Sequence, residues 1–329
     1  MTVIRVLCTA LLVLLASPSL AIDTSADNVQ AFVDRMVSEH GFDRASLIAT
    51  LGRAERKDKI LEAISRPAEG TLSWGEYRGI FLTEERIEAG AAFWREQEDE
   101  LTRIAEATGV PMEILVGIIG VETYFGRITG SYRVLDALAT LAFHYPRRSA
   151  FFTRELEQFL LLVRSEELDA TEPTGSYAGA MGRPQFMPSS YRAYAVDSTG
   201  DGKRDIWNDW EDVAGSIANY FLAHQWRPGD DVAARASLSE QFQGPVPKAA
   251  LKPSSTVAEL KQSGVEFTTG LEGDDATRLI ELDGESGPEH WVGFHNFFVI
   301  TRYNRSVMYA LAVHQLGQDI ADEVARGES

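Results

Sequence analysis

Cysteine is almost absent from this sequence. One cysteine, Cys8, is found among 329 residues, and it lies close to the N-terminus. A disulfide needs two cysteines, and a structural zinc or iron–sulfur site needs several thiolates, so both kinds of site are excluded. Beyond residue 21 no apolar run is long enough to cross a bilayer. The chain is therefore expected to fold without covalent cross-links and without a stable membrane anchor.

Positive charge is also scarce. The chain has 31 Lys and Arg against 49 Asp and Glu, a formal net charge of -18. Nucleic-acid-binding proteins are normally basic, so this balance argues against a nucleic-acid partner. Apolar residues make up 44% of the chain, which is enough for a sizeable core. The length predicts two domains, or one large domain with an insertion.

The N-terminus has the pattern of a secretory signal peptide. Arg5 precedes an apolar run at residues 6–16, and small residues at 17–21 indicate a cleavage site after Ala21. The run is too short to span a bilayer, although an uncleaved anchor or a buried helix is the alternative. Cys8 lies at the start of the run, before any cleavage point, so it is not a lipid-attachment cysteine. We expect residues 1–21 to be removed and the chain to be exported.

The rest of the chain is mainly helical. Apolar residues recur at helical spacing in five stretches, residues 27–39, 84–108, 132–145, 148–163 and 211–224. The composition then changes to Gly, Pro, Ser, Thr and Asp with short alternating stretches, before helical spacing returns at 305–316. We expect a mainly α fold, with helical segments at 22–110, 111–227 and 295–329 and a small β-containing insertion at 228–294.

Glu122 stands out because its surroundings are apolar. Residues 111–123 are hydrophobic on all sides, which is typical of a buried helix. The helical neighbours of Glu122 carry no charge, and they are Ile118, Ile119, Phe125 and Gly126. Burial without a cationic partner raises the pKa of a carboxyl group, as a general acid requires. The alternative is a helix-end glutamate that points into water or pairs with a distant arginine.

Two segments are basic and aromatic within this acidic chain. Residues 123–154 hold five arginines and one acid, Asp136, and residues 173–196 hold no acid. Aromatic faces and arginines suit a sugar polymer with scattered carboxylates, although many of these aromatics are expected in the core. Within the second segment, glycines surround Ser176 and Gln185, which offer hydrogen bonds to a polar ligand. A purely structural tight loop is the competing interpretation.

Four motifs together resemble one known family. They are Gly-Ile-Ile-Gly-Val-Glu-Thr-Tyr-Phe-Gly at 117–126, the loop at 175–191, Ala-Asn-Tyr-Phe at 218–221 and Ile-Thr-Arg-Tyr-Asn at 300–304. The sequence resembles the lytic murein transglycosylase B family, glycoside hydrolase family 103, from about residue 74 to residue 316. The resemblance implies a lysozyme-like helical catalytic core at 111–227, completed by 295–329. It also implies periplasmic cleavage of the MurNAc–GlcNAc bond of peptidoglycan, leaving a 1,6-anhydroMurNAc end.

The resemblance also assigns roles to single residues. Glu122 matches the one catalytic acid and base of the family, and Ser176 matches a serine near the substrate N-acetyl group. The positions that match the substrate groove are Tyr77, Gln185, Phe186, Tyr220, Tyr303, Asn304 and Tyr309. Arg183-Pro184 departs from the Tyr-Gly of some members, which affects local subsite contacts. No catalytic cofactor is implied, and the expected partner is the glycan strand of peptidoglycan; association with other cell-wall enzymes stays open.

A single carboxylate limits the chemistry. A conventional glycosidase uses two, one as acid and one as nucleophile or base, and apart from Asp136 the two segments contain no acid that could be the second. The reaction implied is therefore a non-hydrolytic one, in which the substrate's own N-acetyl oxygen stabilises the cation. A hydrolytic muramidase and a non-catalytic peptidoglycan-binding protein are the alternatives.

A calcium loop is predicted at residues 197–212. Its spacing matches the first half of an EF-hand, with oxygen ligands from Asp197, Thr199, Asp201 and the Lys203 carbonyl. Position twelve is Asn208, which has no bidentate carboxylate. Family members have a longer loop, and on that resemblance Asp212 is the best match for the last ligand. The calcium would be structural, and the alternative is an acidic turn without metal.

Overall fold

The structure is a computed structural model that describes residues 20–65, 72–245 and 250–327. Most of the predicted signal peptide, including Cys8, lies outside these ranges. Its last two residues form a short strand, β1 (Leu20–Ala21), which pairs with β2 (Glu55–Arg56).

Helices dominate the described residues, as the sequence predicts. Their bounds are α1 (Asp27–His40), α2 (Arg44–Gly52), α3 (Asp58–Ser65), α4 (Trp74–Phe81), α5 (Glu84–Glu96), α6 (Glu98–Thr108), α7 (Met112–Thr123), α8 (Val134–His144), α9 (Ser149–Ser165), α10 (Pro188–Tyr194), α11 (Trp210–Ala223), α12 (Val257–Gln262), α13 (His295–Tyr303) and α14 (Val307–Gly327). A 3-10 turn at Pro146–Arg148 joins α8 to α9. The mainly α fold class is confirmed.

The stretch 84–108 is two helices, and the single long run expected from its spacing is wrong. Gln97 leaves the helical conformation (φ -111°, ψ 21°) and separates α5 from α6. The new helix starts with Glu98, Asp99 and Glu100. Three acids in a first turn interact favourably with the positive end of the helix dipole, so they stabilise the N-terminus of a second helix at this point.

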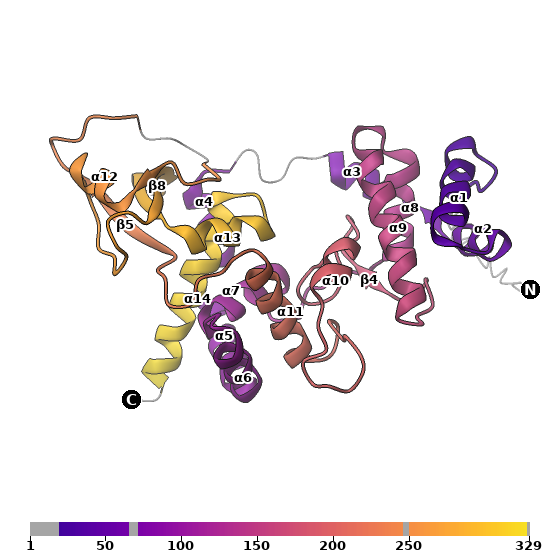
Figure 1. The fold of residues 1–329 in the computed structure, drawn as a ribbon, viewed down its shortest axis with the longest axis horizontal. Coiled ribbons are helices and arrows are strands. Elements are labelled where there is room, and N and C mark those ends of the chain that lie inside the picture. Colours follow the sequence, from indigo (N-terminus) through magenta and orange to yellow (C-terminus); the bar gives the residue numbers. More distant parts are fainter. Residues whose placement is uncertain (1–19, 66–71, 246–249, 328–329) are drawn as a thin grey trace, which may run out of the picture.

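The expected β insertion is present as a five-stranded antiparallel sheet. Its strands are β5 (Ala233–Leu238), β6 (Ser255–Thr256), β7 (Val265–Glu266), β8 (Ala276–Gly284) and β9 (Gly287–Gly293), in the spatial order β6-β8-β9-β5-β7. Together with α12, it has a small apolar core that includes Leu260, Val292 and Phe294. Figure 1 shows this sheet at one end of an elongated molecule and α1 and α2 at the other.

The helices of segment 22–110 divide between two packing groups. Helix α3 contacts α8, which packs on α9, whereas α4 and α5 contact α14 and α6 contacts α11. In Figure 1, α1, α2, α8 and α9 accordingly lie together, apart from α5, α6 and α7. A two-stranded sheet of β3 (Tyr132–Arg133) and β4 (Thr174–Gly175) lies on the chain between the groups.

Helix α7 is the centre of the second group. It packs against α14, α5, α6 and α11, and it is buried from Ile114 to Gly120. Within the described ranges, no single helix has both the length and the apolar composition to span a membrane. Helices α6 and α7 meet that test only when taken together, and they are bent by 119° relative to each other.

Glycine allows α7 and α14 to approach closely. A Cβ atom on Gly317 of α14 would lie 2.0 Å from the Glu113 carbonyl oxygen, and one on Gly117 of α7 would lie 2.4 Å from the Val313 carbonyl oxygen. Both distances are far shorter than a van der Waals contact. Because the obstructing atoms belong to helix backbones, a larger residue forces the two helices apart.

We expect Gly317→Ala to lower the free energy of unfolding by about 1–3 kcal/mol, because overpacking must separate α14 from α7. Gly79→Ala is the matched control. Gly79 lies inside α4 with nothing within 4 Å of an added Cβ, so alanine should be neutral or stabilising by up to about 1 kcal/mol. Urea unfolding of both variants measures the difference. Equal stabilities would contradict the close packing of α7 on α14.

Candidate active site

Glu122 is the second-to-last residue of α7 and is partly exposed, although the helix that carries it is buried. The hydroxyl of Tyr309, from the first turn of α14, donates a hydrogen bond to Glu122 Oε1 at 2.5 Å. The contact of α7 with α14 therefore fixes the carboxylate at a surface-facing helix end. The acid that the sequence singled out is held in place by a buried tyrosine.

Two buried hydroxyls face this carboxylate. Burial, together with the charge of Glu122, raises the pKa of Tyr309 and of Tyr303 well above its ordinary value. The two rings stack with centroids 6.5 Å apart and an interplanar angle of 11°. The Tyr303 hydroxyl donates to the Pro184 carbonyl at 2.6 Å. Both phenols stay neutral at ordinary pH, so they act as donors and add no negative charge beside Glu122.

The backbone directly after Glu122 is strained. Tyr124, Phe125 and Gly126 have φ values of 50°, 58° and 79°, a left-handed conformation that costs free energy in non-glycine residues. Thr123 stabilises this turn, because its hydroxyl accepts from the Gly126 amide at 3.1 Å and lies 3.3 Å from the Arg183 carbonyl. Strain of this kind often accompanies functional sites.

The turn is also supported by cation–π contacts. The guanidinium groups of Arg86 and Arg127 lie 4.7 and 4.9 Å from the centroid of the Tyr124 ring. Arg86 also donates to the Gly120 carbonyl at 3.3 Å, near the end of α7. The Tyr124 hydroxyl donates to Glu85 at 3.1 Å. None of these supporting roles was predicted from the sequence, although the arginine-rich composition of 123–154 was noted.

The glycine-rich loop lies against this turn. The Gln185 side-chain amide donates to the Thr129 carbonyl at 3.1 Å and to the Gly182 carbonyl at 2.8 Å. Gln185 itself has a φ of 52°, so it too is strained. A Cβ on Gly130 would lie 2.1 Å from the Gly175 carbonyl oxygen, so only glycine permits this approach. The loops that carry Glu122 and Ser176 therefore meet.

Ser176 follows β4 and organises its own turn. Its Oγ accepts from the Ala180 amide at 3.1 Å and from the Ala178 amide at 3.3 Å. The side chain is partly exposed, while Tyr177 beside it is 40% exposed. Ser176 is therefore accessible on a rigid turn next to the loop of Glu122.

The predicted aromatic residues gather on one side of the site. Phe186 is 2% exposed and packs against Tyr220 and Tyr303, with centroids 6.0 and 5.8 Å away. The Tyr220 hydroxyl donates to the Arg302 carbonyl at 2.6 Å. Phe186 therefore supports the other rings from the core, as the alternative interpretation of these aromatics allows.

Tyr77 and Asn304 complete the predicted set. Tyr77 is buried and packs between Trp74 and Phe81. Asn304 directly follows α13, is partly buried, and its carbonyl accepts from the Ser306 amide at 2.7 Å. Tyr309 is therefore bonded to Glu122, Tyr303 stacks on Tyr309, and Asn304 follows Tyr303 in the chain, whereas Tyr77 packs with the aromatic residues of α4.

Arg183, where the sequence departs from some family members, is anchored away from the carboxylate. Its guanidinium lies 3.7 Å from the Trp210 ring centroid and donates to the Asn208 carbonyl at 2.9 Å. Its backbone amide donates to the Ile206 carbonyl at 2.9 Å. Arg183 thus connects the loop of Gln185 to the segment that leads into α11.

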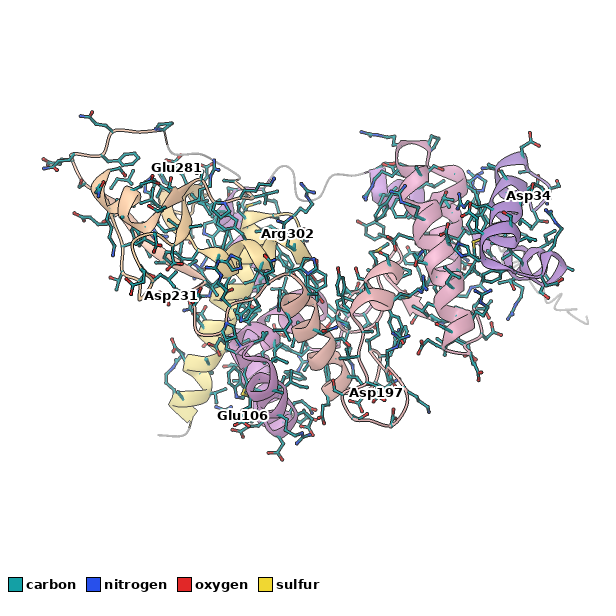
Figure 2. The ribbon with its side chains drawn as sticks, viewed as in Figure 1. Asp34, Glu106, Asp197, Asp231, Glu281 and Arg302 are labelled. Atoms are coloured by element: carbon teal, nitrogen blue, oxygen red, sulfur yellow. The ribbon has the colours of Figure 1, made fainter. Side chains whose placement is uncertain are left out.

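The predicted calcium loop lies between α10 and α11, where Figure 2 labels Asp197. The Asp197 carboxylate accepts from the amides of Gly200 and Gly202 at 2.6 and 2.8 Å. Asp212 is buried and accepts from the amides of Ser198 and Asp205, at 2.7 and 2.8 Å. In the part of the chain that the structure describes, no group of three or more His, Cys, Asp or Glu residues is arranged to hold a metal.

Comparison with known proteins identifies the family. Residues 24–318 match the model of the transglycosylase SLT domain. The chain is 45% identical over 303 residues to membrane-bound lytic murein transglycosylase B of Escherichia coli K12, covering 89% of this chain and 82% of that protein.

Solved structures agree with this match. The catenated lytic transglycosylase SltB1 of Pseudomonas aeruginosa superposes with a TM-score of 0.86 at 48% identity, covering 91% of this chain and 98% of that one. The Escherichia coli lytic transglycosylase Slt35 in complex with calcium gives 0.84 at 44% identity, covering 93% and 97%. A more distant structure, Pseudomonas aeruginosa SltB3 in complex with NAG-NAM-pentapeptide, gives 0.78 at 29% identity, covering 89% and 78%. The chain belongs to the transglycosylase SLT domain family and is a lytic transglycosylase.

Proposed function

We propose that this chain cleaves the MurNAc–GlcNAc bond of peptidoglycan without water, with Glu122 acting first as acid and then as base. The observation that carries the proposal is the fixed position of Glu122, 2.5 Å from the hydroxyl of a buried tyrosine at the end of a buried helix. The charge of this same carboxylate acts on both Tyr303 and Tyr309. Murein is named as the substrate polymer of the Escherichia coli relative, which supports the choice of substrate.

The reaction needs only one carboxyl group. Protonated Glu122 gives its proton to the glycosidic oxygen, and the bond from that oxygen to C1 of MurNAc breaks. The N-acetyl oxygen of the same sugar stabilises the positive charge at C1. Ionised Glu122 then takes the proton from the C6 hydroxyl, whose oxygen bonds to C1 and closes the 1,6-anhydro ring. One proton leaves and returns to Glu122, and no water is consumed.

The surrounding residues have supporting roles in this proposal. Tyr309 occupies one oxygen of Glu122 and stabilises its ionised form after proton donation. Ser176 binds the N-acetyl group, and Gln185, Tyr77, Tyr220, Tyr303 and Asn304 shape the groove. Phe186 supports these rings from the core.

We also propose that loop 197–212 binds a structural calcium ion. All five donors predicted for it are oxygens, the ligand type that calcium prefers, namely Asp197, Thr199, Asp201, the Lys203 carbonyl and Asp212. The proposal rests on this donor chemistry and on the turn of the loop around the Asp197 carboxylate, which the positive φ of Gly200 and Gly202 permits. Slt35 in complex with calcium supports the proposal. The ion would stabilise the turn that precedes α11.

The location follows from the substrate. Murein, on which the relative acts, is a polymer of the cell envelope. We propose that this chain works in the periplasm after removal of residues 1–21. Residues 111–227 and 295–329 form the catalytic core in this proposal, and 22–110 and 228–294 flank it.

We expect Glu122→Gln to reduce cleavage of purified sacculi at least about 1,000-fold while glycan binding is retained, because the amide cannot donate or accept the transferred proton. Glu113→Gln on the same helix is the matched control and should keep full activity. A zymogram and a sacculus-binding assay measure the two properties. Substantial residual cleavage by Glu122→Gln would reject the assignment.

The products of the unmodified chain separate the remaining alternatives. Mass spectrometry should find ends that lack one water relative to a reducing sugar. Reducing ends would indicate a hydrolytic muramidase, and a chain that binds sacculi without lowering their turbidity would be a non-catalytic binding protein.

We expect Tyr309→Phe to slow cleavage by about 10- to 100-fold and to move the alkaline limb of the pH–rate profile to higher pH. The hydroxyl stabilises ionised Glu122, so its loss keeps the acid protonated at higher pH. Tyr145→Phe, on the chain between α8 and α9, is the control and should change neither property. A lower rate with an unmoved pH profile would contradict this role.

We expect calcium to raise the thermal unfolding temperature of the full chain and a chelator to lower it again. Asp201→Asn should weaken the rise, because it removes a ligand charge but keeps an oxygen for the Lys203 amide. Lys203→Ala is the control and should retain the full rise, since Lys203 contributes only its backbone carbonyl. An unfolding temperature that is indifferent to calcium would contradict the site.

A further inference from the structure

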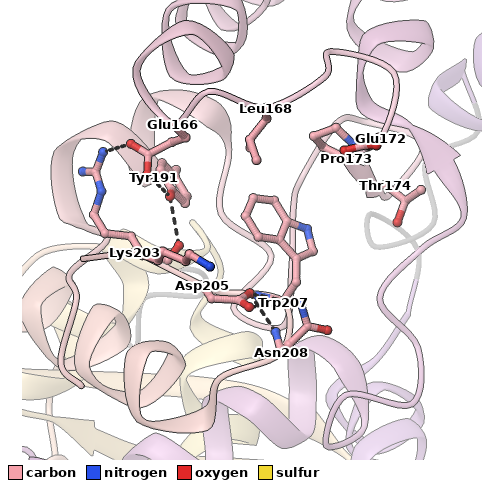
Figure 3. Close-up of a pocket in the computed structure, with 11 residues that line it drawn as sticks. Glu166, Leu168, Glu172, Pro173, Thr174, Tyr191, Lys203, Asp205, Trp207 and Asn208 are labelled. Atoms are coloured by element: carbon pink, nitrogen blue, oxygen red, sulfur yellow. Dashed lines mark hydrogen bonds and ion pairs between the residues drawn. The ribbon is translucent and has the colours of Figure 1, made fainter. Parts of the chain in front are cut away.

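A pocket lies next to the strand that leads to Ser176. Its volume is about 500 Å³, and its walls come from the end of α9, from β4, from α10 and from the segment before α11. Figure 3 shows the Trp207 ring and Leu168 in its middle. The size is typical of a site for a small molecule or a short peptide. None of the residues that line it has a role in the reaction proposed above, and only the backbone carbonyl of Lys203 has a role in the proposed calcium site.

Most polar groups of the pocket are already paired. Glu166 forms an ion pair with Arg204 and accepts from the Tyr191 hydroxyl at 3.2 Å. The Asp205 carboxylate accepts from the amides of Trp207 and Asn208, both at 2.9 Å. These contacts hold the back of the pocket in place, and they leave Glu166 and Asp205 with little capacity to bind a ligand.

Several polar groups remain for a ligand, among them a buried donor and two opposite charges. The Trp207 indole Nε1 is buried and has no hydrogen-bond partner among the described residues. The exposed carboxylate of Glu172 and the exposed ammonium of Lys203 line the same pocket, and in the described ranges neither forms an ion pair or a side-chain hydrogen bond. Figure 3 shows Glu172 and Lys203 on opposite sides, with Trp207 between them. The pocket therefore offers a ligand one hydrogen-bond donor, one negative charge and one positive charge next to apolar side chains.

This arrangement selects a ligand by its charges. A ligand that spans the pocket meets a carboxylate at one end and an ammonium at the other, so it needs an amine and a carboxylate of its own. A neutral sugar gains nothing from either charge, whereas a short peptide satisfies both. Its apolar side chains would contact Trp207, Leu168 and Pro173.

The pocket is also continuous with the catalytic loops. Thr174, which lines it, is two residues before Ser176, and β4 joins the two. On the other wall, Asn208 accepts a hydrogen bond from Arg183, which lies two residues before Gln185. Both walls are therefore joined to the loop of Ser176 and Gln185, where the proposed function places the glycan.

We propose that this pocket binds the peptide stem of peptidoglycan, with Lys203 pairing with its carboxylate and Glu172 with its amine. The inference rests on the proposed function, because it assumes that the groove holds a glycan strand that carries peptides. It extends that function by making the chain sensitive to the peptide as well as to the sugar.

The test follows the indole N–H resonance of Trp207 in the full chain, assigned by its loss in Trp207→Phe. The probes are the free murein pentapeptide, the same peptide with its amines acetylated, and the same peptide with its carboxylates amidated. We expect the free peptide to shift this resonance, and each modification to weaken binding about fivefold.

The variants assign each charge separately. In Lys203→Ala, amidation of the peptide carboxylates should no longer weaken peptide binding, whereas acetylation of its amines still should. In Glu172→Gln, acetylation should no longer weaken binding, whereas amidation still should. Calcium is kept constant throughout, so that loop 197–212 is the same in all samples. Each variant is the control for the other. A variant that failed to fold would lose the effects of both acetylation and amidation, and its other indole resonances would change as well.

Three outcomes would overturn the proposal. They are an unmoved Trp207 resonance, peptide affinity that is indifferent to both modifications in the unmodified chain, and a shift caused instead by a neutral chito-oligosaccharide. Cleavage of peptide-free glycan strands by the unmodified chain tests the proposed function by itself. If the chain does not cleave these strands but still binds the peptide, the proposed reaction is rejected, while the assignment of the pocket to the peptide stands.

Discussion

The close contact of α7 with α14 is the constraint on which the rest of the site depends. Glu122 lies at the end of α7 and Tyr309 at the start of α14, so their hydrogen bond exists only while the two helices keep this separation. Gly117 and Gly317 allow this short separation between the helices, because any side chain at either position would meet the backbone of the other helix. The same packing thus stabilises the core and positions the carboxylate.

The loops around Glu122 are held in conformations that they would not adopt alone. Tyr124, Phe125 and Gln185 all have positive φ, at a free-energy cost that the surrounding contacts must offset. The Thr123 hydroxyl donates to the Arg183 carbonyl and the Gln185 amide donates to the Thr129 carbonyl, and these hydrogen bonds join the two loops. The substrate groove proposed at these two mutually bonded loops would keep its shape on binding, so little of the binding energy would be needed to order it.

The sequence predicts the parts of this site that depend on pattern. The burial of α7 and the isolated Glu122 follow from apolar residues on every side of the helix, and the β insertion follows from its composition. The break at Gln97 was missed because the apolar spacing runs on across it. The pattern also does not predict the left-handed turn at Tyr124, since tyrosine has no preference for it and the contact with Arg86, from a different helix, supports it together with the nearby Arg127. The roles of Tyr303 and Tyr309 came only from family resemblance, because a buried hydroxyl and a core aromatic give the same pattern.

In the reaction proposed for Glu122, one carboxylate acts as both acid and base, so it needs surroundings that strongly favour neither form. A nearby fixed positive charge would hold Glu122 ionised and prevent the first proton transfer, and an entirely apolar pocket would hold it protonated and prevent the second. A neutral phenol lies between these extremes, because it donates a hydrogen bond without adding charge. The pKa of Tyr309 is raised well above its ordinary value by burial and by Glu122 itself, so the phenol cannot ionise when the carboxylate does. Burial on α14 therefore gives Tyr309 the property that the reaction proposed for Glu122 requires.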